Sequence, residues 1–294
     1  MSVLWFLGLA ATSDYAGAAV CAKCHAAEFQ QQSQSAHAHS LAHSSRAQPG
    51  EWAFGAGAQA ITFVKRAGRE NYTEMGQSWY RRLGGLELTP GHHDTRGVLY
   101  RIFDPSAAIL RCFSCHSTGP LTLASDNAIV PHELGVRCEA CHGPAAAHAV
   151  DPARVHMPDP RKLTADDMNR VCGNCHRMPA AVGDATDLQN PWNARHQPLL
   201  LAASRCFRES VGRLSCISCH SPHARVDTRA AAYDAACRTC HARPSHKVAL
   251  AQRTCIECHM PRVRPQPNLA FTNHRIAVYS AADPMKPVFN EASR

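Results

Sequence analysis

Residues 112–116 read C-F-S-C-H, and the same arrangement of two cysteines, two spacer residues and an immediately following histidine occurs seven times in the 294 residues. These seven copies use every cysteine except Cys206. Zinc ribbons, disulfide frameworks and redox-active C-x-x-C sites do not require a histidine directly after the second cysteine. The repeated pattern therefore indicates one chemistry, used seven times, that needs two thiols and an adjacent imidazole.

C-x-x-C-H is the attachment motif of c-type haem, in which the two thiols form thioethers with the porphyrin and the histidine coordinates the iron. The sequence therefore predicts seven covalently bound c-type haems, on motifs numbered one to seven along the chain. The predicted attachment residues are Cys21, Cys24, Cys112, Cys115, Cys138, Cys141, Cys172, Cys175, Cys216, Cys219, Cys237, Cys240, Cys255 and Cys258. The predicted proximal iron ligands are His25, His116, His142, His176, His220, His241 and His259.

The composition agrees with bulky prosthetic groups. Aromatic residues make up only 6 % of the chain, and seven macrocycles would supply the missing apolar core. The formal charge is +8, but no run of five lysines or arginines occurs. Two propionates per haem would turn this charge to about −6 with ferrous iron. The basic character therefore belongs to the haem-free chain, and a nucleic-acid partner is not expected.

The remaining histidines decide whether each iron is closed or open to substrate, because each iron either takes a second axial ligand or keeps a vacant position. His223 follows His220 by three residues, too close to reach the far side of the same iron, so we expect it to ligate a neighbouring haem. His39 and His43 are not expected to be ligands. The expected distal ligands are His37, His148, His223, His246 and His274, and five further candidates are His92, His93, His132, His156 and His196.

Residues 1–18 have the character of a signal-peptide remnant. The apolar run V-L-W-F-L-G-L-A-A is followed by Ala16-Gly17-Ala18, which has the small-residue spacing of a cleavage site. The run is too short to span a bilayer, so an integral membrane protein is not expected. Attachment of c-type haem follows export, which agrees with a periplasmic or extracellular location. Residues 19–294 are then predicted to form a single heptahaem domain.

The predicted fold class is mainly α, with short helices and loops wrapped around stacked haems. Helices are expected over 199–211, 228–243 and 247–259, and another after an N-cap at Thr164. The interval between the first two motifs differs, because short stretches such as A-I-T-F-V-K-R alternate with glycine-containing turns. A small β-rich insertion is therefore expected over about 55–105.

Several longer strings are similar to multihaem cytochromes of the cytochrome c-552/c-554 type. They are C-A-K-C-H-A-A-E-F from residue 21, G-V-R-C-E-A-C-H-G-P from 135, S-R-C-F-R-E-S-V-G-R-L-S-C-I-S-C-H-S-P-H from 204, C-I-E-C-H-M-P-R from 255 and F-T-N-H-R-I from 271. The resemblance implies a mostly helical fold around closely spaced haems and electron transfer outside the cytoplasm. It also implies distal ligands at His37, His148, His223, His246 and His274, and a family cysteine at the position of Cys206.

The predicted function is that of an exported cytochrome that carries electrons between redox partner proteins, quinol-linked or other cytochromes. No catalytic residue is predicted, since the related nitrite reductases use a C-x-x-C-K motif that does not occur here. One alternative is an enzyme that reduces or oxidises a small nitrogen or sulfur oxyanion at an open second or third haem, with Arg111, His92 and His93 binding the anion. Another is a homo-oligomer or conductive filament. For Cys206 we expect a buried free thiol, with an intermolecular disulfide or a ligand role as alternatives.

Overall fold

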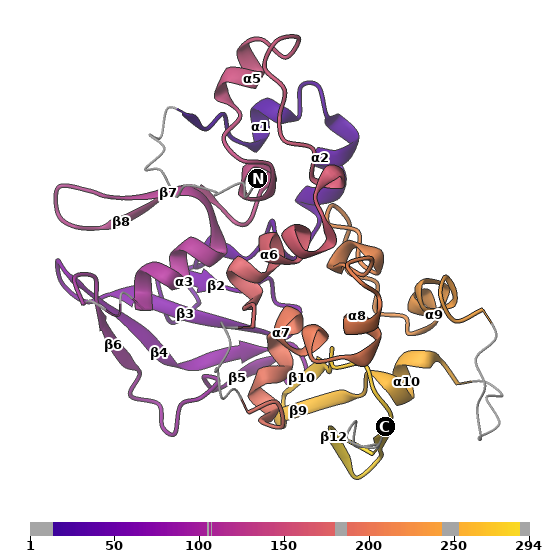
Figure 1. Ribbon diagram of the computed structural model, residues 1–294. Coiled ribbons are helices and arrows are strands. Elements are labelled where there is room, and N and C mark those ends of the chain that lie inside the picture. Colours follow the sequence, from indigo (N-terminus) through magenta and orange to yellow (C-terminus); the bar gives the residue numbers. More distant parts are fainter. Residues whose placement is uncertain (1–13, 105, 107, 180–186, 243–252, 289–294) are drawn as a thin grey trace. The chain divides into compact units, whose positions relative to one another are not determined.

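The computed structural model describes residues 14–104, 106, 108–179, 187–242 and 253–288 (Figure 1). The chain divides into two compact units, the first made of residues 1–160 with 223–225 and the second of the remainder. Most of the predicted signal segment, residues 1–13, lies outside the described residues. The single domain over 19–294 stays a prediction. Among the described residues, none of the helices combines the length and apolar character needed to cross a bilayer.

A six-stranded antiparallel sheet forms the centre of the first unit (Figure 1). Strands β1 to β4 follow one another, and β5 and β6 both pair with β4, so that Trp79 lies opposite Leu86 and Tyr72 opposite Tyr100. Aromatic and β-branched residues of this kind favour strands because they pack well on a pleated surface. The strands are β1 (Leu41–His43), β2 (Trp52–Phe54), β3 (Ala60–Arg66), β4 (Asn71–Tyr80), β5 (Gly85–Leu88) and β6 (Val98–Arg101).

Helix α3 (Ala108–His116), which carries the second motif, packs on this sheet. Its Phe113 is fully buried and meets Phe54 edge-on, with ring centroids 5.0 Å apart. The hairpin β7 (Ser117–Leu123) and β8 (Ile129–Leu134) follows directly. The core cluster comprises Leu41, Phe54, Val64, Tyr72, Ile102, Ile109, Phe113 and Ile129. The other helices of this unit are α1 (Ala18–Cys21), α2 (Ala26–Ser33), α4 (Cys138–His142) and α5 (Ala146–Val150).

The second unit consists mainly of short helices and two small hairpins, and its core cluster is Ala194, Leu200, Val263 and Met285. Thr164 caps α6 as predicted, because its Oγ1 accepts a hydrogen bond from the Asp167 N–H at 3.1 Å. The helices are η2 (Pro160–Lys162, at the boundary of the units), α6 (Ala165–His176), η3 (Pro191–Arg195), α7 (Gln197–Ala202), α8 (Arg205–Glu209), η4 (Cys216–Ser218), α9 (Ala231–Arg238) and α10 (Cys255–His259). The strands are β9 (Arg262–Gln266), β10 (Leu269–Thr272), β11 (Tyr279–Ser280) and β12 (Asp283–Pro287).

The prediction of a mainly α fold is wrong. Helices hold 31 % of the described residues and strands hold 23 %, and several antiparallel sheets occur. Strands were not expected in the β7–β8 and β9–β10 hairpins, where β7, β8 and β9 contain Pro120, Pro131 and Pro265. A proline is tolerated there, since each strand of a two-stranded sheet has a free edge.

The expected helices are also shorter than predicted. The span 199–211 contains the end of α7 and all of α8, and only part of 228–243 is helical, as α9. Of 247–259, residues 247–252 lie outside the described residues, and α10 begins at Cys255.

Candidate haem sites

Each of the seven motifs folds as a helical turn. In the first, fifth and sixth motifs the histidine N–H donates to the carbonyl of the first cysteine, for example from His25 to Cys21 at 2.8 Å. The second and fourth motifs end α3 and α6, and the third and seventh form α4 and α10. Residues three and four apart share one face of a helix, so each turn presents two thiols and one imidazole together.

The motif thiols are not joined to one another by disulfide bonds in this structure, and all fifteen cysteines are free. Within the part of the chain that the structure describes, no three His, Cys, Asp or Glu side chains gather as they would around a zinc ion. The donor set therefore fits a group that takes two thioethers and one imidazole from each motif.

The first cysteines of different motifs meet in pairs. The Cys21 and Cys138 side chains form a hydrogen bond, and burial together with this contact raises the pKa of Cys21 to about 11. The same contact joins Cys172 to Cys216 in the second unit, where it lowers the pKa of Cys172. A third contact joins Cys237 to Cys255. Motifs one and three, four and five, and six and seven therefore lie side by side.

In two of these motif pairs, a side chain before one motif binds the first backbone N–H of the other motif. Asn169 stands three residues before the fourth motif, and its Oδ1 accepts from the N–H of Cys216, the first residue of the fifth motif, at 2.9 Å. Asp234 stands three residues before the sixth motif, and its Oδ1 accepts from the N–H of Cys255 at 2.9 Å. Each side chain satisfies a free donor at the start of the next motif's turn. The repeated spacing is visible in the sequence, although we did not predict this role.

Two pairs of imidazole rings face each other at the distance that a shared iron requires. The ring centroids of His142 and His223 lie 6.1 Å apart, and those of His220 and His274 lie 6.2 Å apart. Two imidazoles on opposite sides of one metal, each with a metal–nitrogen distance of about 2 Å, place their ring centres roughly 6 Å apart. The ring of His223 therefore lies near the histidine of the third motif, and its role as a ligand of a neighbouring haem stays a prediction.

Hydrogen bonds at Nδ1 orient six histidines. Metal-bound histidines usually donate their second ring nitrogen in this way. Burial is the main reason that the pKa values of His196 and His274 fall to about 4, so both are neutral, the form that binds metals. The Nδ1 partners are Ser40 O for His116, Val155 O for His148, Gln197 Oε1 for His176, Asn193 Oδ1 for His196, Ala277 O for His259 and Thr272 O for His274, at 2.6–3.1 Å.

The other candidate ligands lie in varied places. His132 is on β8, where its ring contacts Tyr15 at 5.3 Å. The carbonyl of His37 accepts from the Val136 N–H. His93 and His156 are exposed, as are His39 and Arg111, and His246 lies outside the described residues. The Cys206 thiol is partly buried, and its pKa is raised mainly by this burial and by the nearby Cys240.

A polar cluster on the sheet lies near the second motif. The Tyr100 hydroxyl donates to Glu74 Oε2 at 2.7 Å, and His92 Nε2 lies 3.7 Å from the same oxygen. Burial raises the pKa of Cys112 to about 11, and the charge of Glu74 adds to this effect. Three residues, His92, His93 and Arg111, were proposed to bind an oxyanion. Among their described contacts, only that of His92 is with the Glu74 carboxylate.

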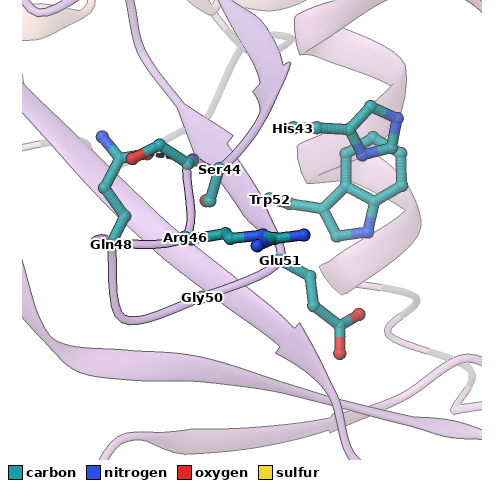
Figure 2. A pocket seen from close by; sticks show the side chains of 8 residues that line it. His43, Ser44, Arg46, Gln48, Gly50, Glu51 and Trp52 are labelled. Carbon is teal, nitrogen blue, oxygen red and sulfur yellow. Dashed lines mark hydrogen bonds between the residues drawn. The ribbon is translucent and has the colours of Figure 1, made fainter.

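A pocket of about 470 Å³ lies at the loop between β1 and β2. Figure 2 shows the side chains that line it. Its wall includes the rings of His43 and Trp52, which are tilted by 33° and have centroids 4.3 Å apart. Trp52 also meets Phe113, the residue that follows Cys112 in the second motif, edge-on at 5.1 Å. Aromatic side chains therefore connect this surface with the second motif.

Two of the helices that carry motifs, α9 and α10, bury none of their side chains. The short helix α8, which precedes the fifth motif, also buries none. Yet α9 has the sequence A-A-Y-D-A-A-C-R, with apolar residues that are normally covered. A porphyrin attached at each motif would cover such surfaces, so the residues present fit covalent haem.

Comparison with known proteins also finds similarity to cytochromes. Residues 101–143, which contain the second and third motifs, match the model of the family "Cytochrome c554 and c-prime". No curated protein sequence matches the chain significantly.

Two solved structures share the fold. The outer cell wall cytochrome OcwA has a TM-score of 0.56 and 16 % identity, over 90 % of this chain and 79 % of that one. The undecahaem cytochrome from the S-layer of Carboxydothermus ferrireducens has a TM-score of 0.55 and 16 % identity, over 92 % of this chain and 53 % of that one. The chain thus spans about half the length of the second structure. The protein therefore carries a segment of the cytochrome c554 type on the fold of multihaem cytochromes, which confirms the resemblance predicted from its motifs.

Proposed function

We propose that the protein carries electrons between redox partners through seven covalently attached c-type haems. When bound, each haem takes up and releases one electron at its iron. The fourteen motif cysteines would hold the porphyrins, and the seven motif histidines would bind the iron from one side. The observation that carries the proposal is the facing of His142 with His223 and of His220 with His274.

Facing imidazoles favour electron transfer over substrate chemistry. An iron with a histidine on each side has no vacant position for a substrate, so its protein ligands restrict it to electron exchange. The His274 side chain is partly buried, and its Nδ1 lies 2.9 Å from the Thr272 carbonyl oxygen, which keeps its ring in place. The anchored Nδ1 atoms of His148 and His196 support the same distal role, although no facing partner ring is described for them.

The paired motifs support electron transfer from one attached haem to the next. Contact between first cysteines places two attachment points together in each pair, so the groups attached there would adjoin. Asn169 and Asp234 hold two of these pairs at the backbone. Rigid spacing of this kind is what a protein contributes when the cofactor supplies the chemistry.

The proposal also covers where the protein acts and which proteins exchange electrons with it. Thioether attachment of haem follows export, and the two similar structures are named as outer cell wall and S-layer cytochromes. We therefore place the protein outside the cytoplasm, in the periplasm or beyond it. Its partners would be other redox proteins, either cytochromes or quinol-linked enzymes.

A coulometric redox titration tests the proposal. We expect the purified protein to accept seven electrons per chain, in overlapping one-electron steps that reverse on reoxidation. The c-type absorption bands should follow the same electron count. Fewer than seven electrons per chain, with the remaining motifs carrying free thiols, would contradict the heptahaem proposal.

A second candidate function rests on the cluster beside the second motif. Glu74, Tyr100 and His92 could hand protons to a small nitrogen or sulfur oxyanion reduced at that haem, if its iron were open. Such an iron would bind carbon monoxide after reduction, whereas a closed haem would not. This binding separates the two functions.

A further inference from the structure

Asn169 and Asp234 hold equivalent positions in the second unit but differ in charge. Each side chain precedes one motif by three residues and accepts from the N–H of the cysteine that opens the next motif, at 2.9 Å in both cases. Asn169 is buried, and Asp234 is partly buried in α9. The chain therefore places a neutral amide oxygen at the start of the fifth motif and a carboxylate oxygen at the start of the seventh.

Both oxygens also contact the sulfur of that first cysteine. Asn169 Oδ1 lies 3.0 Å from Cys216 Sγ. Burial, followed by a hydrogen bond to Asp234, raises the pKa of the Cys255 thiol to about 11. Thioether formation consumes the thiol hydrogen but leaves the cysteine N–H, so each oxygen would stay beside the point where haem is attached.

The carboxylate of Asp234 brings a negative charge that the amide of Asn169 lacks. None of the ion pairs described in the second unit includes Asp234. Ferric haem carries one positive charge more than ferrous haem, so a carboxylate next to it stabilises the ferric form. Partial burial strengthens this attraction, because the effective dielectric constant near a protein surface is lower than in water.

We propose that the charge of Asp234 lowers the reduction potential of the haem attached at the seventh motif, whereas Asn169 fills the same position at the fifth motif without this effect. A haem of lower potential gives up its electron more readily, so Asp234 favours electron transfer away from the seventh motif. This role rests on the proposed function, because it requires haem at both motifs.

Coulometric redox titration of two reciprocal variants tests this role. Asp234→Asn removes the charge but keeps an oxygen that can accept from Cys255, and Asn169→Asp adds the charge at the fifth motif. The measured quantity is the equilibrium constant for full reduction of the haem-loaded chain, obtained from the sum of its midpoint potentials. We expect Asp234→Asn to raise this constant about threefold or more, and Asn169→Asp to lower it by a similar factor. A threefold change corresponds to about 28 mV in that sum, at about 59 mV per factor of ten.

Glu70→Gln is the matched control, because it removes a carboxylate charge from an exposed residue between β3 and β4 of the first unit. Exposed charges are screened, so we expect a change of less than about 1.5-fold. An unchanged constant in Asp234→Asn, with seven electrons taken up, would overturn the role of Asp234 and leave the proposed function standing. A rise in Asn169→Asp, or an equal effect of Glu70→Gln, would overturn it as well. A parent chain that takes up no electrons would contradict both proposals.

Amide hydrogen exchange of the haem-loaded protein checks the contact itself. The Cys255 amide should exchange in Asp234→Asn as it does in the parent chain. Asp234→Ala should accelerate this exchange roughly tenfold, because it removes the acceptor. Equal exchange in Asp234→Ala and the parent chain would contradict the placement of Asp234 beside the seventh motif and overturn its role.

Discussion

Replacing His223 with alanine is expected to open one iron in seven, the one attached at the third motif. The ring of His223 faces His142 at 6.1 Å, so its removal leaves that iron without a second imidazole. The oxidised variant should gain a high-spin electron paramagnetic resonance signal. After reduction, about one more haem in seven should bind carbon monoxide than in the parent chain.

His274→Ala should have the same effect at the fifth motif, because His274 faces His220 at 6.2 Å. The double variant should open about two haems in seven. His39→Ala is the matched control, since this exposed histidine is not expected to be a ligand. An unchanged carbon monoxide stoichiometry in His223→Ala or His274→Ala would contradict the assigned ligand pairs.

Without haem, the second unit is expected to lose its structure while the first keeps its sheet. The second unit's core cluster has four buried apolar residues, and α8, α9 and α10 bury none. The first unit has an eight-residue core cluster between its sheet and α3. Burial of apolar surface is the main force that offsets chain entropy, so only the first unit has enough of it without haem.

Amide hydrogen exchange of the chain made without haem attachment checks this expectation. Strands β3 and β4 should remain protected, whereas α9 and α10 should exchange as an unstructured chain does. The haem-loaded protein, measured in parallel, should protect both regions. Protection of α9 and α10 in the haem-free chain would show that protein packing alone stabilises the second unit.

Features of the structure that depend on interactions between neighbouring residues could be predicted from the sequence. The cap at Thr164 was predicted because it needs only the first turn of its own helix. Strands were harder to predict, because Pro131 and Pro265 interrupt the alternation that identifies them. Their hairpins form because each proline lies on a strand with a free edge.

The candidate site could be predicted in part for the same reason. The attachment residues are read directly from seven identical spacings. Distal ligands depend on residues far apart in the chain, so the partner of His223 in the third motif emerged only from the structure. The roles of Asn169 and Asp234 were missed because each side chain accepts from the first backbone N–H of another motif. Even so, the shared spacing of Asn169 and Asp234 before a motif was a signal in the sequence.

Electron paramagnetic resonance of the oxidised parent protein, followed by carbon monoxide addition to the reduced form, tests the central claim most directly. An electron carrier whose irons are closed by histidine pairs should show only low-spin signals and no spectral change with carbon monoxide. A high-spin signal from about one haem in seven, with matching carbon monoxide binding, would contradict that claim and favour an oxyanion-converting site at an open iron.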